Sequence, residues 1–394
     1  MHSPDEDELV GPLNVGPIAH GGHCVARLEG RVIFVRDTIP GEKVLARLVD
    51  TTHDHYWWAR AERIIEASPH RVRPPCPVAG SCGGCDFQHV ELSAQRGLKA
   101  AVVAEQLQRL AGVKWQVLVQ QVPGDDAGLS WRTRMRYLTA ADGHSPTGSQ
   151  VGLRAWHSDR LVELPAQGCL IADRRGPSVA ELKQFADRYG ELQVCVADDV
   201  ISVKAKDEQV AGPKVVKQRV RTREFQVAAD GFWQVHPGAA EVLTRVVLEQ
   251  LQPQPGEGAL DLYCGVGLFA GALVDAGCQV TGVELSKLAA KQAKQNVPQA
   301  TFIAGPLERN LVKLPTKTDI IVLDPPRTGA GRQVVRKLAA TNARAISYVA
   351  CDPAALARDI KTFAELGWEL TELRAFDLFP MTHHVECVAK LTRR

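Results

Sequence analysis

No stretch of this 394-residue chain is apolar over the ~18 residues that a helix needs to cross a bilayer. Residues 2–8 are polar and acidic, whereas a secretion signal begins with basic residues. Internal repeats and low-complexity segments are missing, aromatic residues make up only 6%, and the net charge of +2 is too small to indicate a partner. These absences exclude a helical membrane protein and a repeat protein. We therefore expect a cytoplasmic monomer without a membrane partner, built from two or three domains.

Ten cysteines are present, although the cytosol keeps thiols reduced and disulfides are rare there. Cys76, Cys82 and Cys85 are close together in the sequence, and Cys169 follows in a separate segment. Four thiolates can hold a zinc ion or a [4Fe–4S] cluster. Zinc sites usually combine two Cys-x2-Cys pairs, and here one such pair accompanies two single cysteines. The spacing favours the cluster, and a reduced, unliganded group is the alternative.

Residues 1–68 are predicted to form a small, OB-like β-barrel, because short β-rich segments alternate with turns from about residue 11 onward. Such barrels often bind single-stranded nucleic acid through basic grooves and aromatic rings. Tyr56, Trp57 and Trp58 are candidates for a stacking platform. Neighbouring residues of a strand point to opposite faces, so we expect at most one of the two tryptophans to be exposed.

Residues 69–227 form the predicted central domain. A proline-rich segment leads into the cysteines, and residues 90–111 have the apolar spacing of a helix that can pack on the domain formed by residues 228–394. The remainder is predicted to be β-rich and includes two basic strands, 131–137 and 214–223. Alternation along these strands places cationic side chains on one face, which suits contact with RNA phosphates. A solvated sheet face explains the same pattern.

Residues 228–394 are predicted to form a doubly wound α/β domain with a mostly parallel sheet, because strands and helices alternate along them. The last two strands are joined by a short connection and are therefore expected to be antiparallel. In open sheets of this kind, ligands bind outside the carboxyl ends of the strands. Residues that directly follow the strands are therefore the first candidates for a site.

Three of these strand ends carry residues suited to a nucleoside cofactor. The first ends in Asp261-Leu-Tyr-Cys-Gly-Val-Gly267, whose glycines let a ligand approach the backbone. Glu284 follows at the end of the second, where a carboxylate can bind ribose hydroxyls. Ala270 replaces the third glycine of a dinucleotide motif, which favours S-adenosylmethionine. Asp324 precedes two prolines that fix an extended backbone, and a rigid turn without a further role is the alternative.

Cys351 and Glu386 are the candidate catalytic residues. Cys351 lies between a strand and a helix, where a thiolate is stabilised, although a lone cysteine is more often a core residue. Glu386 opens the last strand among apolar residues, which raise the pKa of a carboxylate and suit it to act as a general base. For a lone glutamate, a solvated strand face is the alternative. His383 and His384 give no separate signal and are interpreted as structural.

Five segments identify a resemblance. They are Gly231-Phe-Trp-Gln-Val-His-Pro237, the Asp-Leu-Tyr-Cys-Gly turn, Asp-Pro-Pro-Arg, Tyr-Val-Ala-Cys-Asp-Pro and Phe-Pro-Met-Thr-His-His-Val-Glu, in this order. Together they resemble the RNA 5-methyluridine methyltransferases over the whole chain, since members often carry an amino-terminal TRAM barrel and an iron–sulfur cluster. The resemblance implies a Rossmann-like class I methyltransferase domain that takes S-adenosylmethionine and acts on rRNA or tRNA.

The resemblance also implies roles for single residues. The Cys351 thiolate would add to C6 of a flipped uracil, C5 would take the methyl group, and Glu386 would remove the C5 proton. The cofactor would be held by Gln234, Tyr263, Glu284 and Asp324. A [4Fe–4S] cluster with a structural, RNA-orienting role would be held by Cys76, Cys82, Cys85 and Cys169.

Three residues depart from the family pattern. Asp352 stands where the family has asparagine, and its carboxylate is expected to raise the pKa of Cys351. Leu268 and His236 stand where members have asparagines near the cofactor. These departures leave open an RNA-binding iron–sulfur protein with a degenerate methyltransferase domain. An RNA cytosine-C5 methyltransferase is a second alternative, but its usual Pro-Cys arrangement is absent at Cys351.

Overall fold

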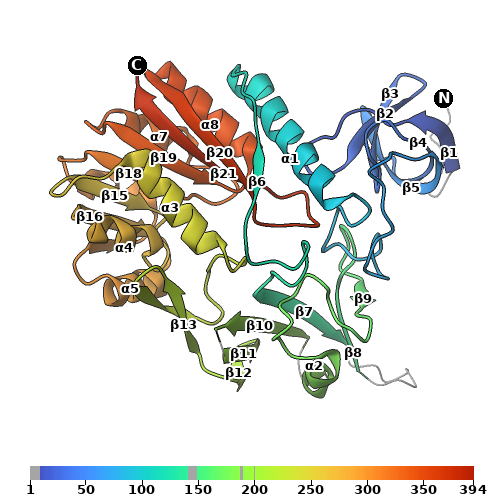
Figure 1. Cartoon of the computed structure of the whole chain (residues 1–394), viewed down its shortest axis with the longest axis horizontal. Helices are drawn as coiled ribbons and strands as arrows, with labels where there is room; N and C mark the ends of the chain where they lie inside the picture. Colours follow the sequence, from blue (N-terminus) through green and yellow to red (C-terminus); the bar gives the residue numbers. More distant parts are fainter. Residues whose placement is uncertain (1–8, 141–148, 187–189, 199) are drawn as a thin grey trace.

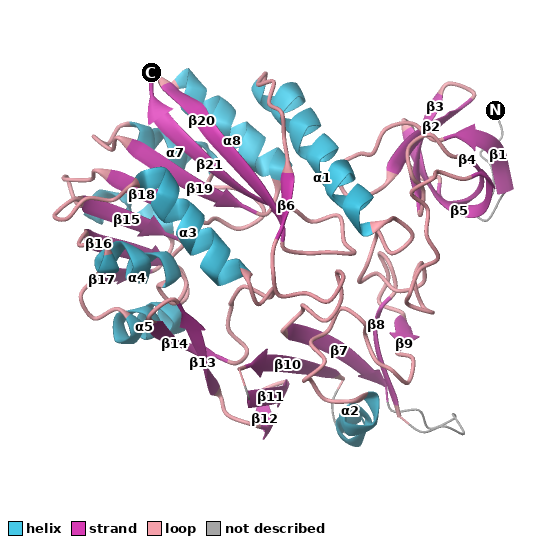
Figure 2. Ribbon diagram, viewed as in Figure 1, coloured by secondary structure: helices cyan, strands magenta, loops and turns pink. Residues whose placement is uncertain are grey.

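The computed structural model describes residues 9–140, 149–186, 190–198 and 200–394, and its strands form four sheets. Three larger sheets are arranged around a central region of loops (Figures 1 and 2). Within the described residues, no helix combines the length and the apolar character needed to cross a membrane.

The amino-terminal sheet is a curled half-barrel. Its order is β1-β4-β5-β3-β2, and the strands are β1 (Leu9–Asn14), β2 (Cys24–Leu28), β3 (Arg31–Arg36), β4 (Lys43–Asp50) and β5 (Tyr56–Glu66). The outer strands β1 and β2 contact each other without pairing. Trp57 is buried beneath Arg31, whereas Trp58 is partly exposed on the opposite face. The prediction that at most one of these rings is exposed is confirmed, and the TRAM assignment stays a prediction.

The central sheet has the order β12-β11-β10-β7-β8-β9 and is antiparallel. Its strands are β7 (Arg134–Ala140), β8 (Gln150–Arg154), β9 (Leu161–Glu163), β10 (Glu191–Ala197), β11 (Val200–Ala205) and β12 (Glu208–Ala211). Helix α2 (Val179–Ala186) packs on β7 and β8 through Val179 and Leu182. The β-rich character predicted for this part of the chain is confirmed, and α2 is an exception within the described residues, because Val179 and Leu182 follow a helical spacing.

The basic strand 214–223 forms a separate hairpin of β13 (Val215–Val220) and β14 (Arg223–Ala228). Its valines Val216 and Val220 are buried in the core of the catalytic domain. Lys217 points to the solvent and pairs with Glu224, a side chain of the same hairpin. The charge of Lys217 is therefore balanced within the hairpin, as expected of a solvated sheet face.

The catalytic sheet has eight strands in the order β17-β16-β15-β18-β19-β21-β20-β6. They are β6 (Val119–Gln121), β15 (Gly258–Leu262), β16 (Gln279–Glu284), β17 (Thr301–Ala304), β18 (Ile320–Leu323), β19 (Ala345–Ala350), β20 (Trp368–Asp377) and β21 (Glu386–Arg393). Strands β15 to β19 are parallel, and β21 is antiparallel to both β19 and β20. The predicted doubly wound fold and its antiparallel final pair are confirmed.

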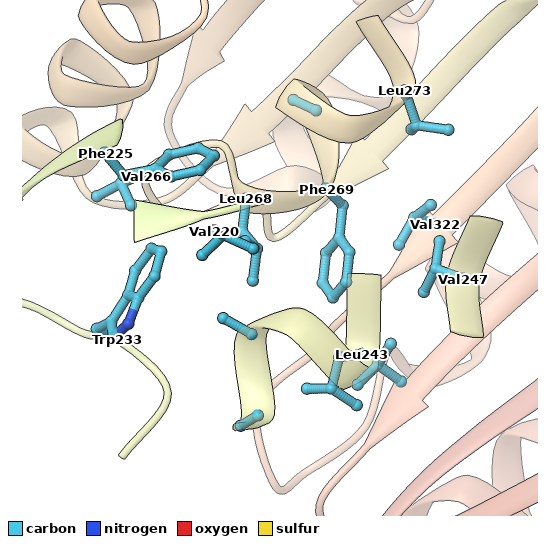
Figure 3. Packing of buried hydrophobic residues seen from close by; sticks show 14 of the residues in the cluster. Val220, Phe225, Trp233, Leu243, Val247, Val266, Leu268, Phe269, Leu273 and Val322 are labelled. Atoms are coloured by element: carbon cyan, nitrogen blue, oxygen red, sulfur yellow. The ribbon is translucent and has the colours of Figure 1, made fainter. Parts of the chain in front are cut away.

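Helices cover both faces of this sheet. One face carries α3 (Ala239–Leu251) and α4 (Leu268–Asp275), with α5 (Lys287–Asn296) beside β14. The other carries α1 (Leu92–Gln106), which continues as a π-helix (Leu107–Ala111), α7 (Gly331–Ala339) and α8 (Pro353–Glu365). A short helix, α6 (Leu307–Asn310), and a 3₁₀ turn (Leu311–Lys313) follow β17. Figure 3 shows the first face, where Leu243 and Val247 of α3 pack near Phe269 of α4.

Helix α1 is tied to the sheet by a buried ion pair. Lys99 Nζ lies 2.6 Å from Asp377 Oδ1 and donates to the carbonyl oxygen of Phe379 at 3.0 Å. The two side chains are 0% and 2% exposed. Asp377 also stands opposite Gln121 of β6, so segments that precede residue 122 complete the catalytic sheet and its cover.

Candidate active site

The candidate nucleophile and base lie side by side at one edge of the catalytic sheet. Ala350, the last residue of β19, stands opposite Cys387 of the antiparallel strand β21. Continuing this register by one position places Cys351 opposite Glu386. Asp324 ends the neighbouring strand β18, so it lies at the same edge. These residues come together, as predicted, because β19 ends at the same edge of the sheet at which the antiparallel strand β21 begins.

A cavity of about 1370 Å³ opens at this edge of the sheet. Cys351 and Glu386 line it, together with the residues proposed for the cofactor: Gln234, Tyr263, Glu284 and Asp324. Side chains of the amino-terminal and central sheets line its other end. The structure thus brings all six residues to one space between three sheets.

The glycine turn after β15 is shaped to hold a nucleoside. Gly265 and Gly267 have φ of +54° and +92°, which few other residues adopt, and the space beside Gly265 is open. Glu284 accepts hydrogen bonds from the N–H groups of Gly265 (2.9 Å) and Ser286 (2.7 Å), which fixes its carboxylate at the cavity. Leu285 is 66% exposed at the cavity, so an apolar surface is ready for a flat ring. This arrangement fits S-adenosylmethionine.

The pKa values of Asp324 and Glu386 are raised. Burial raises the pKa of Asp324 to about 7. The pKa of Glu386 is raised well above its ordinary value, first by burial and then by Asp324, and Arg327 opposes this shift. The predicted rise in the pKa of Glu386 is confirmed.

The expectation of a stabilised Cys351 thiolate is wrong for the unliganded protein. Burial raises the pKa of Cys351 to about 12, and the charge of Glu386 adds to this shift. Arg327 lowers the pKa, but its effect is smaller than that of burial. A dry site beside a carboxylate therefore outweighs the favourable position at a helix start.

Asp352 has its charge directed away from the nucleophile. Its Oδ1 caps α8 by accepting from the N–H of Ala355 at 2.7 Å, and its Oδ2 lies 3.0 Å from Nε2 of His20. These partners lower the pKa of Asp352, against the effect of burial. Glu386 and Asp324, rather than Asp352, are the carboxylates that raise the pKa of Cys351. The expected effect of Asp352 on the thiol is therefore not seen.

The other two departures have different surroundings. Leu268 lines the cavity at the start of α4 and packs into the apolar core (Figure 3). His236 is 1% exposed, accepts from the N–H of Gly238 at 3.1 Å and lies 3.8 Å from Asp125. His236 is absent from the cavity lining, so it supports the turn before α3 rather than contacting a cofactor there.

Arg327 and His384 are site residues to which sequence reasoning gave no role. Nη2 of Arg327 lies 3.1 Å from Nε2 of His384, and both residues line the cavity. Because a guanidinium can only donate, Nε2 of His384 is the acceptor and the imidazole is neutral, with its proton on Nδ1. Burial lowers the pKa of His384 to about 3, which agrees with this assignment. The Asp-Pro-Pro-Arg segment carried the signal for Arg327.

The four candidate cluster cysteines lie near one another. The pKa of Cys85 is raised by burial and then by the charges of Cys169 and Cys82, and Cys76 acts in the same way on Cys82. The N–H of Gly84 lies 3.4 Å from the sulfur of Cys82. In the part of the chain that the structure describes, no three histidine, cysteine or acidic side chains converge closely enough to hold a single metal ion. The geometry therefore gives no support to a zinc site, and it does not establish a cluster.

The fold and the site together define a methyltransferase of the S-adenosylmethionine-dependent class, and comparisons with known proteins agree. Residues 311–394 match the family described as tRNA (Uracil-5-)-methyltransferase, and residues 239–347 match the methyltransferase small domain. An uncharacterized RNA methyltransferase of Streptomyces avermitilis is 44% identical, with 96% of this chain and 97% of that protein covered. A relative with the same description from Bifidobacterium longum is 34% identical, with coverages of 99% and 98%.

A solved structure shows the same fold over nearly the whole chain. The Pyrococcus abyssi tRNA (uracil-54, C5)-methyltransferase, in complex with S-adenosyl-L-homocysteine, has a TM-score of 0.71 and 22% identity. The match covers 97% of this chain and 99% of that one. The chain belongs to the same family of RNA methyltransferases as the relatives from Streptomyces avermitilis and Bifidobacterium longum.

Proposed function

We propose that the protein methylates C5 of a uridine in rRNA or tRNA through a covalent bond between Cys351 and C6 of the base. The observation that carries the proposal is the register of β19 and β21, which sets Cys351 beside Glu386 in the cofactor cavity. A nucleophile and a base at adjacent positions can reach neighbouring ring atoms of one pyrimidine.

Each residue has a defined task in this reaction. The Cys351 thiol releases its proton to water as its sulfur forms a bond to C6, and the electrons of the C5–C6 double bond move toward O4 to give an enolate. Gln234, Tyr263, Glu284 and Asp324 would hold S-adenosylmethionine, which would supply the methyl group to C5 through cleavage of its methyl–sulfonium bond and would leave as S-adenosylhomocysteine. Glu386 takes the C5 proton, the double bond re-forms, and the bond from C6 to sulfur breaks.

The electrostatics of the pair support these roles. A charged Cys351 and a charged Glu386 destabilise each other, which adds to the effect of burial on the pKa of the thiol. Burial and the charge of Asp324 raise the pKa of Glu386, so its carboxylate binds a proton more strongly than that of an exposed glutamate. This favours Glu386 as the group that takes the C5 proton.

Transfer of a labelled methyl group to RNA from cells that lack the gene tests the proposal, followed by mapping of the modified nucleotide. Cys351→Ala is expected to abolish transfer, whereas Cys278→Ala, a control outside the cavity lining, is expected to retain it. Glu386→Gln is expected to accumulate an RNA–protein adduct that survives denaturation, because addition proceeds and release does not. Methylation of any atom other than uridine C5, or full activity of Cys351→Ala, would refute the mechanism.

We further propose that Cys76, Cys82, Cys85 and Cys169 hold a [4Fe–4S] cluster. A thiol-only donor set suits iron–sulfur chemistry, and the ligands of a four-iron cluster lie further apart than those of one ion. Iron and sulfide content after anaerobic purification, compared with that of Cys85→Ser, tests this assignment. Zinc in place of iron, or equal iron in both proteins, would contradict it.

A further inference from the structure

The cavity continues beyond the catalytic residues to a group of aromatic rings. His23 and Trp58 come from the amino-terminal sheet, and Trp156 and His157 come from the turn after β8. At about 1370 Å³ the cavity exceeds the ~300–1,000 Å³ of most ligand pockets. Space therefore remains at the aromatic end when a cofactor and one flipped base occupy the other.

The four rings form one continuous surface across two sheets. The rings of Trp156 and His157 are stacked, with centroids 4.0 Å apart and an angle of 21° between their planes. Trp58 meets Trp156 edge-on at 5.6 Å and lies 4.6 Å from His23. His157 is exposed and has a φ of +46°, an uncommon conformation that presents its ring at the outer end of the stack.

The turn after β8, which carries Trp156 and His157, is held in place by backbone contacts with Cys82 and Gly83. The N–H of Gly83 donates to the carbonyl oxygen of Arg154 at 2.9 Å, and Cys82 forms a β-bridge with Ala155. A Cβ atom on Gly83 would lie 3.1 Å from the backbone of Trp156, so a side chain at this position would require the turn to shift by a few tenths of an ångström. The guanidinium of Arg36, 6% exposed, lies 4.3 Å from the centre of the Trp156 ring.

We propose that the surface formed by His23, Trp58, Trp156 and His157 stacks an unpaired base that flanks the target uridine. The inference rests on the proposed function and deepens it: the substrate is single-stranded at two nucleotides at least. Aromatic rings stack any base, because every base has a π-face. Arg132 lines the same cavity and forms no ion pair with a described carboxylate, so it is available to a backbone phosphate.

The full-length protein with its native metal content is titrated into seven-nucleotide oligouridylates that carry 2-aminopurine at one position. Stacking quenches the fluorescence of 2-aminopurine, and we expect strong quenching at one position beside the target. Trp156→Ala is expected to remove this quenching and Trp156→Phe to restore most of it. Trp115→Ala is the matched control, because Trp115 is also partly buried but lies outside the cavity lining.

Kinetics with the methylated RNA provide a second readout. Trp156→Ala is expected to raise the KM for RNA roughly 5- to 100-fold, the range for loss of one stacked base, while kcat and the Kd for S-adenosylmethionine stay near wild type. Gly83→Ala is expected to raise the same KM by displacing the turn. Quenching at no position, together with an unchanged KM in Trp156→Ala, overturns the inference even if the wild type methylates uridine. Position-specific quenching without methyl transfer refutes the proposed function but still supports the stacking of a base on this surface.

Discussion

Replacement of Lys99 by methionine tests how firmly the amino-terminal half of the chain is joined to the catalytic sheet. Methionine keeps much of the length of the side chain but removes the ammonium that contacts Asp377 at 2.6 Å and the carbonyl oxygen of Phe379 at 3.0 Å. Both partners of the ion pair are essentially inaccessible to water, with exposures of 0% and 2%. Asp377 would therefore be left as a buried carboxylate without its cation.

The expected cost follows from this burial. Removing one partner of a buried ion pair typically costs about 3–5 kcal/mol, because the remaining charge is uncompensated. The phenylalanine carbonyl also loses its donor, which places the expected loss near the upper end of this range. A double variant, Lys99→Met with Asp377→Leu, removes both charges and is expected to recover much of the stability.

Urea unfolding followed by tryptophan fluorescence measures the free energy of unfolding of each variant. Lys217→Met is the matched control, because Lys217 is 66% exposed in its pair with Glu224 and should contribute less than about 1 kcal/mol. If Lys99→Met lowers the free energy of unfolding by less than about 1 kcal/mol, or if the double variant is less stable than the single one, the pair does not hold α1 to the sheet. Methyl transfer is expected to fall with stability, since the loop that follows Phe379 leads to Glu386.

Two further substitutions test other charges. Asp261→Asn is expected to raise the free energy of unfolding by up to about 4 kcal/mol at pH 7, because about three pH units separate the unfolded pKa of an aspartate from pH 7 and each corresponds to about 1.4 kcal/mol. At pH 4, close to the unfolded pKa, the same substitution is expected to raise the free energy of unfolding by almost nothing. Burial raises the pKa of Asp261 to about 8, so stability is lost as pH rises from the unfolded pKa toward that value. Equal gains in urea titrations at both pH values would contradict this. Asp352→Ala is expected to cost about 1 kcal/mol through loss of the α8 cap, whereas Asp352→Asn keeps the cap; equal losses would contradict the assigned role.

The doubly wound sheet could be predicted because its strands and helices carry local patterns that repeat along the chain. The position of Cys351 opposite Glu386 followed in outline from the same patterns, since both residues stand at the ends of strands in one sheet. The pairing of β6 with β20 could not be foreseen. Three residues of an ordinary β-rich segment give no indication that their partner lies far away in the sequence.

Contacts between the sheets could not be predicted from the sequence for a related reason. His20 reaches Asp352 across the boundary between the amino-terminal and catalytic sheets, and neither residue has a local pattern that predicts the other. For Cys351 the helix start predicted a stabilised thiolate and Asp352 a raised pKa, whereas the rise in its pKa comes first from burial, which is not visible in the sequence. Trp156 likewise acquires its setting only when the turn after β8 meets Trp58.

The pairing of β6 with β20 has a consequence for the order in which the protein is made. Strand β6 leaves the ribosome early, but its partner is synthesised only after well over half the chain has followed. Strand β21, which carries Glu386, is made after β20. A chain that stops before residue 368 therefore lacks both the partner of β6 and the candidate base. The edge pairing of the sheet waits for β20, and the pairing of Cys351 with Glu386 waits for β21.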